Sequence, residues 1–303
     1  LLTNRLQRGT IQQIVAFCFI SYSIKQTVIG DDNIMKADRT IYYSSYTDDV
    51  VKSHNQSFKL KTNYEWINNS LLFKMASMVI YVLAIVIGYI CCKLFFNISY
   101  KNRKLLKKCK KDGYFVYANH TQPVGDVVIP ALACVGKRVY VIVSQANYGI
   151  PVIGKILPEL GALPVPDSIS QYKKFTEAYK KHIEQGHPVI IYPEAHVWPY
   201  YTQIRPFEKT SFRFPAELNK PVYVMTTTYT HRHFLKNIIK RPKVNVYIDG
   251  PFYPDTGAGI KDNQKMLHDR VYEVMKSRSH LSDYEYIRYE RKNVCLLYTS
   301  DAA

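Results

Sequence analysis

Two side chains in the middle of the chain are of the types that share a proton in catalysis. His120 and Asp126 follow the apolar run Tyr114–Ala118, which is predicted to be a strand. A histidine can take a proton from an attacking hydroxyl near neutral pH, and a carboxylate on its other ring nitrogen fixes the tautomer. Because residues six apart on one helix face different ways, a turn must join them, and Pro123 and Gly125 favour one. Taken alone, such a pair also arises by chance.

A second group of polar residues follows another predicted strand, further along the chain. Glu194 and His196 come directly after the apolar run Pro188–Tyr192, where polar groups reach a ligand without crossing the core. Downstream, Arg205 and Lys209 are the cation types that hold a phosphate, Arg as a two-pronged donor and Lys as a point charge. The alternative for each cation is an ordinary solvated surface position.

Short β-rich runs alternate with helical patterns from Gly113 onward. Their near-continuous apolar character predicts strands covered on both faces, and the runs are Tyr114–Ala118, Arg138–Val143, Pro188–Tyr192, Pro221–Thr228 and Lys243–Ile248. Residues 168–185 and 261–278 have the spacing of amphipathic helices, and Gly186 fits just past the end of the first. This alternation predicts an α/β fold with a largely parallel central sheet flanked by helices.

An apolar segment precedes this domain. Residues 75–92 carry no charge, lie between Lys74 and Lys93, and would span about 27 Å as a helix, close to the thickness of a hydrocarbon core. Phe95 and Phe96 suit the aromatic belt at the membrane surface. We therefore predict a transmembrane or membrane-embedded helix over residues 71–96. A buried core helix is the alternative.

Seven basic residues and no acidic residue lie between Lys101 and Lys111. The positive-inside bias puts the following residues on the cytoplasmic side of the inner membrane, and the cluster would attract anionic lipids. The whole chain has a net charge of +17, which favours an anionic partner without choosing among phospholipid, nucleic acid and phosphorylated substrate.

The cysteines and histidines do not predict a metal site or a disulfide framework. The six cysteines form no CxxC pair and are interpreted as reduced and structural. His231 and His233 are the only close pair of histidines, and they lack nearby Cys or carboxylate partners at ligand spacing. We therefore expect no metal and no resident cofactor.

Five blocks occur in an order that resembles the 1-acylglycerol-3-phosphate (lysophosphatidic acid) acyltransferase family. The resemblance covers roughly residues 113–230, and the blocks are Asn119-His120…Asp126, Gly149-Ile150-Pro151…Gly161-Ala162-Leu163, Tyr192-Pro193-Glu194, Pro206-Phe207-Glu208-Lys209 and Asn219-Lys220-Pro221-Val222. It implies a glycerolipid acyltransferase-like fold with His120 as base, Asp126 as its orienter and the block around Glu194 as part of the glycerol-phosphate site. We expect substrate contacts from Asn119, Glu194, His196, Arg205 and Lys209.

The chain departs from the family pattern at three places. Five residues rather than four separate His120 from Asp126, which requires a slightly wider turn. The stretch from Gly161 ends in Asp167 where a phosphate-binding Arg is expected, and Glu194 is followed by Ala-His-Val rather than Gly-Thr-Arg. We hypothesise that Arg205, Lys209 and His196 take over the anion contacts, as in a divergent branch.

The resemblance implies a membrane-bound enzyme that moves a fatty acyl group from acyl-CoA or acyl carrier protein to a lysophospholipid hydroxyl. No Gly-x-Ser-x-Gly nucleophile motif is present, although the sequence leaves Cys134 open as a nucleophile. Two alternatives remain: an acyltransferase for a different lipid or glycolipid acceptor, and a non-catalytic membrane protein that binds anionic lipid. Binding of nucleic acid through Lys and Tyr side chains is not expected, because no nucleic-acid motif is found.

The chain divides into four predicted parts. Residues 1–70 form an N-terminal extension, in which Met35 is a candidate start and residues 1–34 then precede the natural protein. The membrane helix occupies residues 71–96 and the acyltransferase α/β domain residues 101–290. The tail, residues 295–303, continues no pattern and is interpreted as an artefact.

Overall fold

The computed structural model describes residues 40–51, 57–93, 97–109, 111–123, 125–232 and 241–292. Several sequence predictions lie outside these residues: those on residues 1–34 and Met35, on the aromatic-belt residues Phe95 and Phe96, on His233, and on the tail 295–303.

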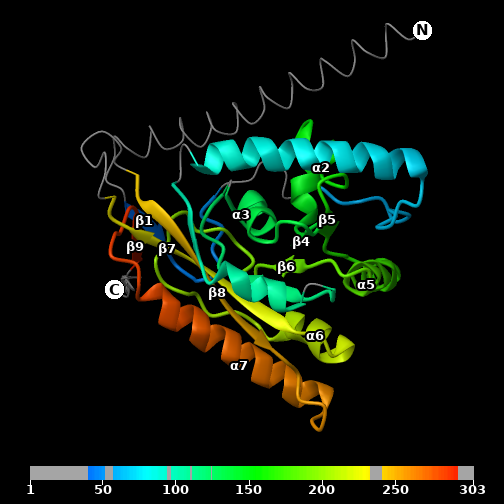
Figure 1. The fold of residues 1–303 in the computed structure, drawn as a ribbon. Coiled ribbons are helices and arrows are strands. Elements are labelled where there is room, and N and C mark those ends of the chain that lie inside the picture. The colour runs from blue at the N-terminus through cyan, green and yellow to red at the C-terminus, as the bar shows by residue number, and fades with distance from the viewer. Residues whose placement is uncertain are drawn as a thin grey trace, which may run out of the picture.

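A seven-stranded sheet lies at the centre of the molecule, with α2 on one side of it and α7 on the other (Figure 1). The strand order is β2 (Ser99–Lys101), β8 (Lys243–Phe252), β7 (Val222–Thr230), β3 (Phe115–Ala118), β6 (Val189–Ile191), β4 (Tyr140–Val143) and β5 (Ala162–Pro164). The strands from β7 to β5 run parallel, whereas β8 is antiparallel to β7 and β2 is parallel to β8. The predicted fold class, α/β with a largely parallel sheet, is confirmed.

The inner strands β3, β6 and β7 are almost entirely buried because both faces of the sheet are covered. Along β3, Val116 and Ala118 point into a core shared with α2, α3 (Gly125–Ala133) and the 3₁₀ helix η2 (Arg103–Cys109). Phe115 and Tyr117 point into the opposite core, with α5 (Ile169–Glu184) and α7 (Ile260–Ser279). The helices therefore form two layers, one on each face of the sheet. With both faces covered, the ends of the strands are the places where a ligand can reach the sheet.

The two predicted amphipathic helices are present as α5 and α7. Ser168 caps α5 by accepting a hydrogen bond from the amide of Gln171, and Gly186 adopts a φ of +84° just past its end. The shorter elements were not predicted, and they are η3 (Gln145–Gly149), α4 (Ile153–Ile156), η4 (Thr210–Phe212) and α6 (Arg213–Leu218).

The predicted membrane helix is α2 (Leu71–Cys91), which is long and apolar enough to cross a membrane by length and composition. One face packs on the domain. The Ser77 hydroxyl donates to the carbonyl of Glu159, the Tyr81 hydroxyl accepts from the amide of Val139, and Gly88 lies against Val128 of α3. Only 11% of its apolar stretch is buried inside the protein, so most of the surface of α2 is exposed. This is consistent with membrane association.

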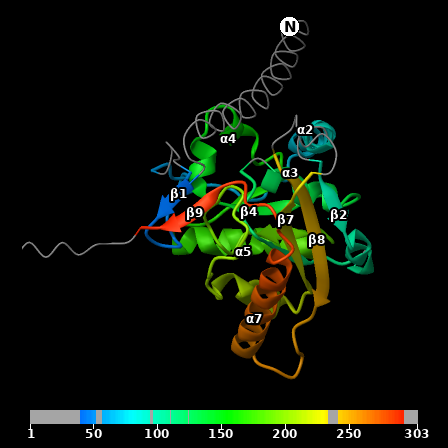
Figure 2. The same cartoon turned by 90° about the vertical axis from the view of Figure 1, so that its left-hand side faces the viewer.

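A two-stranded ribbon lies apart from the main sheet. β1 (Thr40–Tyr43) and β9 (Arg288–Arg291) pair in parallel, although the whole domain separates them in sequence (Figure 2). We call this pair the β1–β9 ribbon. It was not predicted, because each strand is short and carries mixed polar and aromatic residues.

The basic cluster after α2 forms part of η2. Leu106 and Cys109 are buried and fix η2 to the domain, whereas Lys104, Lys107 and Lys108 are exposed. The guanidinium of Arg103 donates to the carbonyls of Leu132 and Ala133 at the end of α3, where a cation favours the helix dipole.

Candidate active site

His120 and Asp126 meet at the carboxyl edge of the parallel strands. His120 follows β3, and Asp126 lies in the first turn of α3. The Nδ1 atom of His120 lies 2.7 Å from Oδ2 of Asp126. The chain therefore folds back between them, in the region where Pro123 and Gly125 indicated a turn, and the extra residue relative to the family spacing does not separate the two side chains.

Backbone groups hold the carboxylate of Asp126 in place. The amide of Gln122 donates to Oδ2 of Asp126 at 2.9 Å, and the amide of Asp126 donates to the carbonyl of Gln122 at 2.9 Å. The carboxylate thus caps the start of α3, where the helix dipole favours negative charge. Burial raises the pKa of Asp126 above its ordinary value, and the hydrogen bond with His120 acts in the opposite direction.

Tyr192 supports both members of the pair. Its ring stacks on the imidazole of His120, with 4.5 Å between ring centroids and 27° between planes. Its hydroxyl donates to the backbone carbonyl of Asp126. Burial raises the pKa of Tyr192 well above its ordinary value, so this residue is a neutral hydrogen-bond donor.

The two side chains differ in exposure. The imidazole of His120 is 23% exposed and the carboxylate of Asp126 only 5%. Because the carboxylate occupies Nδ1, the favoured tautomer carries its proton there and leaves Nε2 as the basic nitrogen. The arrangement is that of a general base that reaches solvent, oriented by a buried acid.

Asn119 is buried and does not have the position predicted for it. Its amide nitrogen donates to the carbonyl of Thr227 at 3.0 Å, and its amide oxygen accepts from the Thr227 amide at 2.8 Å. The side chain therefore joins the end of β3 to β7. We correct the prediction of a substrate contact, because both polar groups are occupied by backbone.

Glu194 and Arg205 form a buried ion pair. Their side chains are 0% and 1% exposed, with 3.5 Å between Oε2 and Nη2. The Glu194 carboxylate accepts from the amides of His120 and Arg205, at 2.9 and 2.8 Å. Burial lowers the pKa of Arg205, and Glu194 partly offsets this. Both side chains hold backbone groups and neither is exposed, so the structure does not place Glu194 and Arg205 at the surface, where the predicted substrate contacts would need them.

Residues 97–230 match a protein-family model described as Acyltransferase. This segment of the chain is thus similar to the acyltransferase family. The resemblance found in the sequence is thus confirmed at the level of the acyltransferase family, and the matched segment runs from before β2 to the end of β7. A search of curated protein sequences gives no match.

A crystal structure of the 1-acyl-sn-glycerophosphate (LPA) acyltransferase PlsC from Thermotoga maritima is similar to this acyltransferase. The similarity covers 70% of this chain and 95% of that chain, with 16% sequence identity and a TM-score of 0.45.

The remaining predicted contacts of the acyltransferase are His196 and Lys209. His196 is half-buried two residues after Glu194, and so stays near the pair. The carbonyl of Lys209 accepts from Gln264, near the start of α7. The end of α7 lies near the pair, because Tyr229 bonds both Thr121 and Ser282.

Cys134 is not placed to act as the nucleophile of the acyltransferase. Its side chain is buried, and burial raises the pKa of its thiol to about 11. A thiol that remains protonated at neutral pH is a poor nucleophile. In the part of the chain that the structure describes, Cys92, Cys109 and Cys134 form no disulfide bond.

Four supporting residues were not predicted from the sequence: Tyr192, Thr121, Gln122 and Tyr229. The Tyr229 hydroxyl lies 2.7 Å from the Thr121 hydroxyl and accepts from the Gln122 side chain at 2.9 Å. Tyr192 directly precedes the Pro-Glu pair and could have been found from that position. Nothing local marks Tyr229, which is over a hundred residues from Thr121 and meets it only in the fold.

No group of three or more potential metal ligands occurs in the part of the chain that the structure describes. A shallow depression of about 360 Å³ lies at the start of α5, lined by Pro166, Asp167, Ser168, Ile169 and Tyr172. It contains neither His120 nor Asp126.

Proposed function

We propose that this acyltransferase moves a fatty acyl group from a thioester to the hydroxyl of a lysophospholipid, forming phosphatidic acid from lysophosphatidic acid. The single observation that carries the proposal is the contact of 2.7 Å between His120 and Asp126 inside the acyltransferase segment. The five sequence blocks support a glycerolipid acceptor. The donor is acyl-CoA or acyl carrier protein, used as a co-substrate, and the reaction needs no resident cofactor.

In the proposed mechanism, Nε2 of His120 removes the proton of the acceptor hydroxyl as its oxygen attacks the thioester carbonyl. Asp126 stabilises the positive charge that develops on the imidazole. The carbon–sulfur bond then breaks, and the imidazolium returns the proton to the leaving thiolate. The result is an ester and a free thiol, and no acyl-enzyme is formed.

The location of the reaction follows from the substrate. A lysophospholipid resides in the bilayer, and the exposed apolar surface of α2 supports attachment there. We propose that the catalytic domain lies on the cytoplasmic side of the inner membrane, where the exposed lysines of η2 face anionic headgroups or the acidic donor.

A second candidate function is acyl transfer to a different acceptor, such as a glycolipid. One observation favours keeping it: Arg205, predicted to replace a missing family arginine, is buried on Glu194. The two candidate functions differ in the headgroup of the acceptor lipid, and the assay described next compares acceptors with different headgroups.

The decisive experiment is acyl transfer by membranes that contain the protein, with labelled acyl-CoA or acyl carrier protein as donor. Lysophosphatidic acid is offered beside zwitterionic, neutral and sugar-bearing acceptors. Because positioned base catalysis contributes about 10²–10⁴-fold, His120→Ala should lower kcat/KM by about that factor, and Asp126→Asn should also lower it by disturbing the tautomer.

The matched control is His280→Ala, which removes an exposed histidine beyond α7. Its activity should equal that of the wild-type protein. A His120→Ala protein that retains near-wild-type turnover would refute the base. A folded wild-type protein that transfers acyl groups to none of the acceptors would refute the proposed reaction.

A further inference from the structure

The buried pair of Glu194 and Arg205 has no evident role in contacting a substrate. Removing two charges from water is costly, and a buried pair often stabilises a fold no better than apolar residues would. The side chains are 0% and 1% exposed. A functional reason for the pair must therefore come from the groups that it holds inside the protein.

Glu194 holds the backbone of the proposed base. Its Oε2 atom accepts from the amide of His120 at 2.9 Å, and its Oε1 atom accepts from the amide of Arg205 at 2.8 Å. In addition, the carbonyl of His120 accepts from the amide of Trp198 at 3.0 Å. Residues 194–205 therefore form a loop that is hydrogen-bonded to both the amide and the carbonyl of His120. We call it the grip loop.

Arg205 joins the grip loop to a part of the chain outside the family match. Its Nη1 atom donates to the carbonyl of Tyr46 at 3.2 Å, and its Nη2 atom donates to the carbonyl of His196. The guanidinium lies 4.7 Å from the centroid of the Trp198 ring. Tyr46 follows β1, whereas the family match begins at residue 97.

The β1–β9 ribbon packs on the same tryptophan. The Trp198 ring stacks on Tyr289 of β9, with 5.0 Å between centroids and 6° between planes, and lies 4.8 Å from Tyr43 of β1. Its indole nitrogen donates to the carbonyl of Asp48 at 2.9 Å. The Tyr289 hydroxyl donates to the carbonyl of Pro199 at 2.8 Å. Both strands of the ribbon thus pack against the grip loop.

We propose that Arg205 is a positioning residue that couples the β1–β9 ribbon to His120. It balances the charge of Glu194 and so keeps the carboxylate on the amide of His120, while the carbonyl of Tyr46 and the ring of Trp198 keep the guanidinium in place. The inference rests on the proposed function, because it assigns His120 the role of base. According to the proposal, two segments outside the matched region, residues 43–48 and 288–292, help to hold His120 in position.

The test compares Arg205→Gln and Arg205→Lys with the wild-type protein in membranes. Small displacements of a reacting group cost up to about a hundredfold in rate, so Arg205→Gln should lower kcat roughly tenfold to a hundredfold. The KM for the acceptor should stay unchanged, because Arg205 does not touch it. Arg205→Lys keeps the charge without the fork and should recover part of the loss.

The matched control is Arg213→Gln. Arg213 also pairs with a glutamate, Glu217, but it is exposed on α6. Its loss should leave kcat and KM as in the wild-type protein.

Trp198→Phe is a milder variant, needed if Arg205→Gln does not fold. It keeps the charges and one aromatic ring, and removes the bond from the indole nitrogen to Asp48 together with part of the ring surface. We expect kcat to fall roughly threefold to tenfold, at least the loss typical of one hydrogen bond, again with an unchanged KM.

Hydrogen exchange of the His120 amide gives a readout that needs no substrate. Peptides that cover residues 119–123 are followed by mass spectrometry, and exchange at His120 should be at least about tenfold faster in Arg205→Gln than in the wild-type protein, because a protected amide loses its acceptor. Failure of the wild-type protein to transfer acyl groups refutes the proposed function and leaves this readout intact. A raised KM with unchanged kcat in Arg205→Gln, or wild-type kinetics and wild-type exchange together, would overturn the positioning role.

Discussion

The side chain of His120 reaches solvent while the groups around it are buried. Asp126, Tyr192 and Glu194 each fix a different part of it: the Nδ1 atom, the ring face and the backbone amide. Such support restricts the imidazole to one orientation and leaves Nε2 for chemistry. The same packing explains the positions of Asn119 and Arg205, whose side chains are buried and bond to backbone groups.

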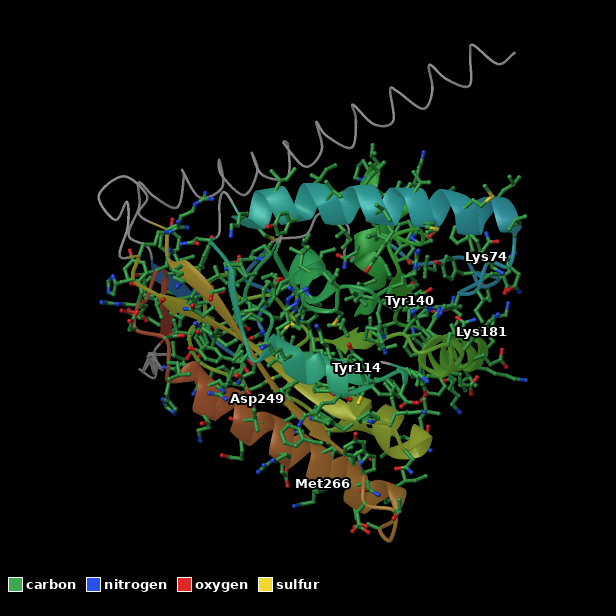
Figure 3. The ribbon with its side chains drawn as sticks, viewed as in Figure 1. Lys74, Tyr114, Tyr140, Lys181, Asp249 and Met266 are labelled. Carbon is green, nitrogen blue, oxygen red and sulfur yellow. The ribbon has the colours of Figure 1, made fainter. Side chains whose placement is uncertain are left out.

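A buried histidine away from the site makes stability depend on pH. His182 of α5 stacks on Tyr140 of β4, which lies between α2 and α5 (Figure 3), with 3.5 Å between ring centroids. Burial lowers the pKa of His182 from its ordinary 6.5 to about 4. Between these values the unfolded chain binds a proton that the folded chain does not. The stability is therefore fully present above pH 6.5 and is lost as the pH falls toward 4.

We predict that His182→Phe reduces this loss. Phenylalanine keeps the stacking on Tyr140 and cannot titrate, so the variant should lose about 2–3 kcal/mol less stability than the wild-type protein between pH 7 and pH 4. Denaturant unfolding in detergent at several pH values measures the difference. The control is His280→Phe at an exposed site. An equal loss in His182→Phe and the wild-type protein would contradict the prediction.

At the scale of elements, α2 packs on the helix that carries Asp126. Gly88 of α2 faces Val128 of α3, and a Cβ atom at residue 88 would lie 2.4 Å from Cγ1 of Val128. A valine side chain is stiff, so the two helices would have to move apart. Val128 lies two residues after Asp126, and a shift of α3 would displace the carboxylate.

Gly88→Ala should therefore lower activity about tenfold and cost about 1–2 kcal/mol of stability, the range for overpacking. The double variant Gly88→Ala/Val128→Ala removes the clashing methyl groups and should recover most of the activity. Acyl transfer and thermal unfolding in detergent measure both effects. Gly259→Ala is the control, because a Cβ atom there meets only an ordinary contact at 3.5 Å. The prediction fails if the second substitution brings no recovery.

At the scale of the whole molecule, exposed apolar side chains are concentrated on α2. The outer face of α2 exposes ten large apolar side chains, which are Leu71, Leu72, Met75, Met78, Val79, Val82, Leu83, Val86, Tyr89 and Ile90. α7 lies on the opposite side of the sheet (Figure 1). The side of the protein that carries α2 thus suits a membrane.

Charges on that face should release the protein from membranes. Val79 and Val86 are 59% and 51% exposed, and a lysine at the centre of a bilayer costs about 2.5–3.5 kcal/mol. We expect Val79→Lys/Val86→Lys to move from the membrane fraction toward the soluble fraction in vesicle flotation. Ile260→Lys, on an exposed residue at the start of α7, should float with vesicles like the wild-type protein. Unchanged flotation of the double variant would argue against α2 as the anchor.

Much of the architecture could be predicted because its signals are local. Apolar runs such as Tyr114–Ala118 need only be buried on both faces to become strands, and Ser168 and Gly186 mark the ends of α5 by their own backbone preferences. The antiparallel direction of β8 could not be predicted, because an apolar run has no direction. The strands β2 and β5, at three residues each, are too short to show a period.

Residue types and spacing were enough to place a histidine and an aspartate at a strand end beside a turn, because these are local properties. Which nearby polar groups face outward could be seen only in the folded chain. Glu194, Arg205 and Asn119 look like ligands in sequence, yet their partners are backbone groups up to about 160 residues away, at Tyr46, His120 and Thr227. Such contacts depend on which distant segments come together, and only the packing of the folded chain specifies that.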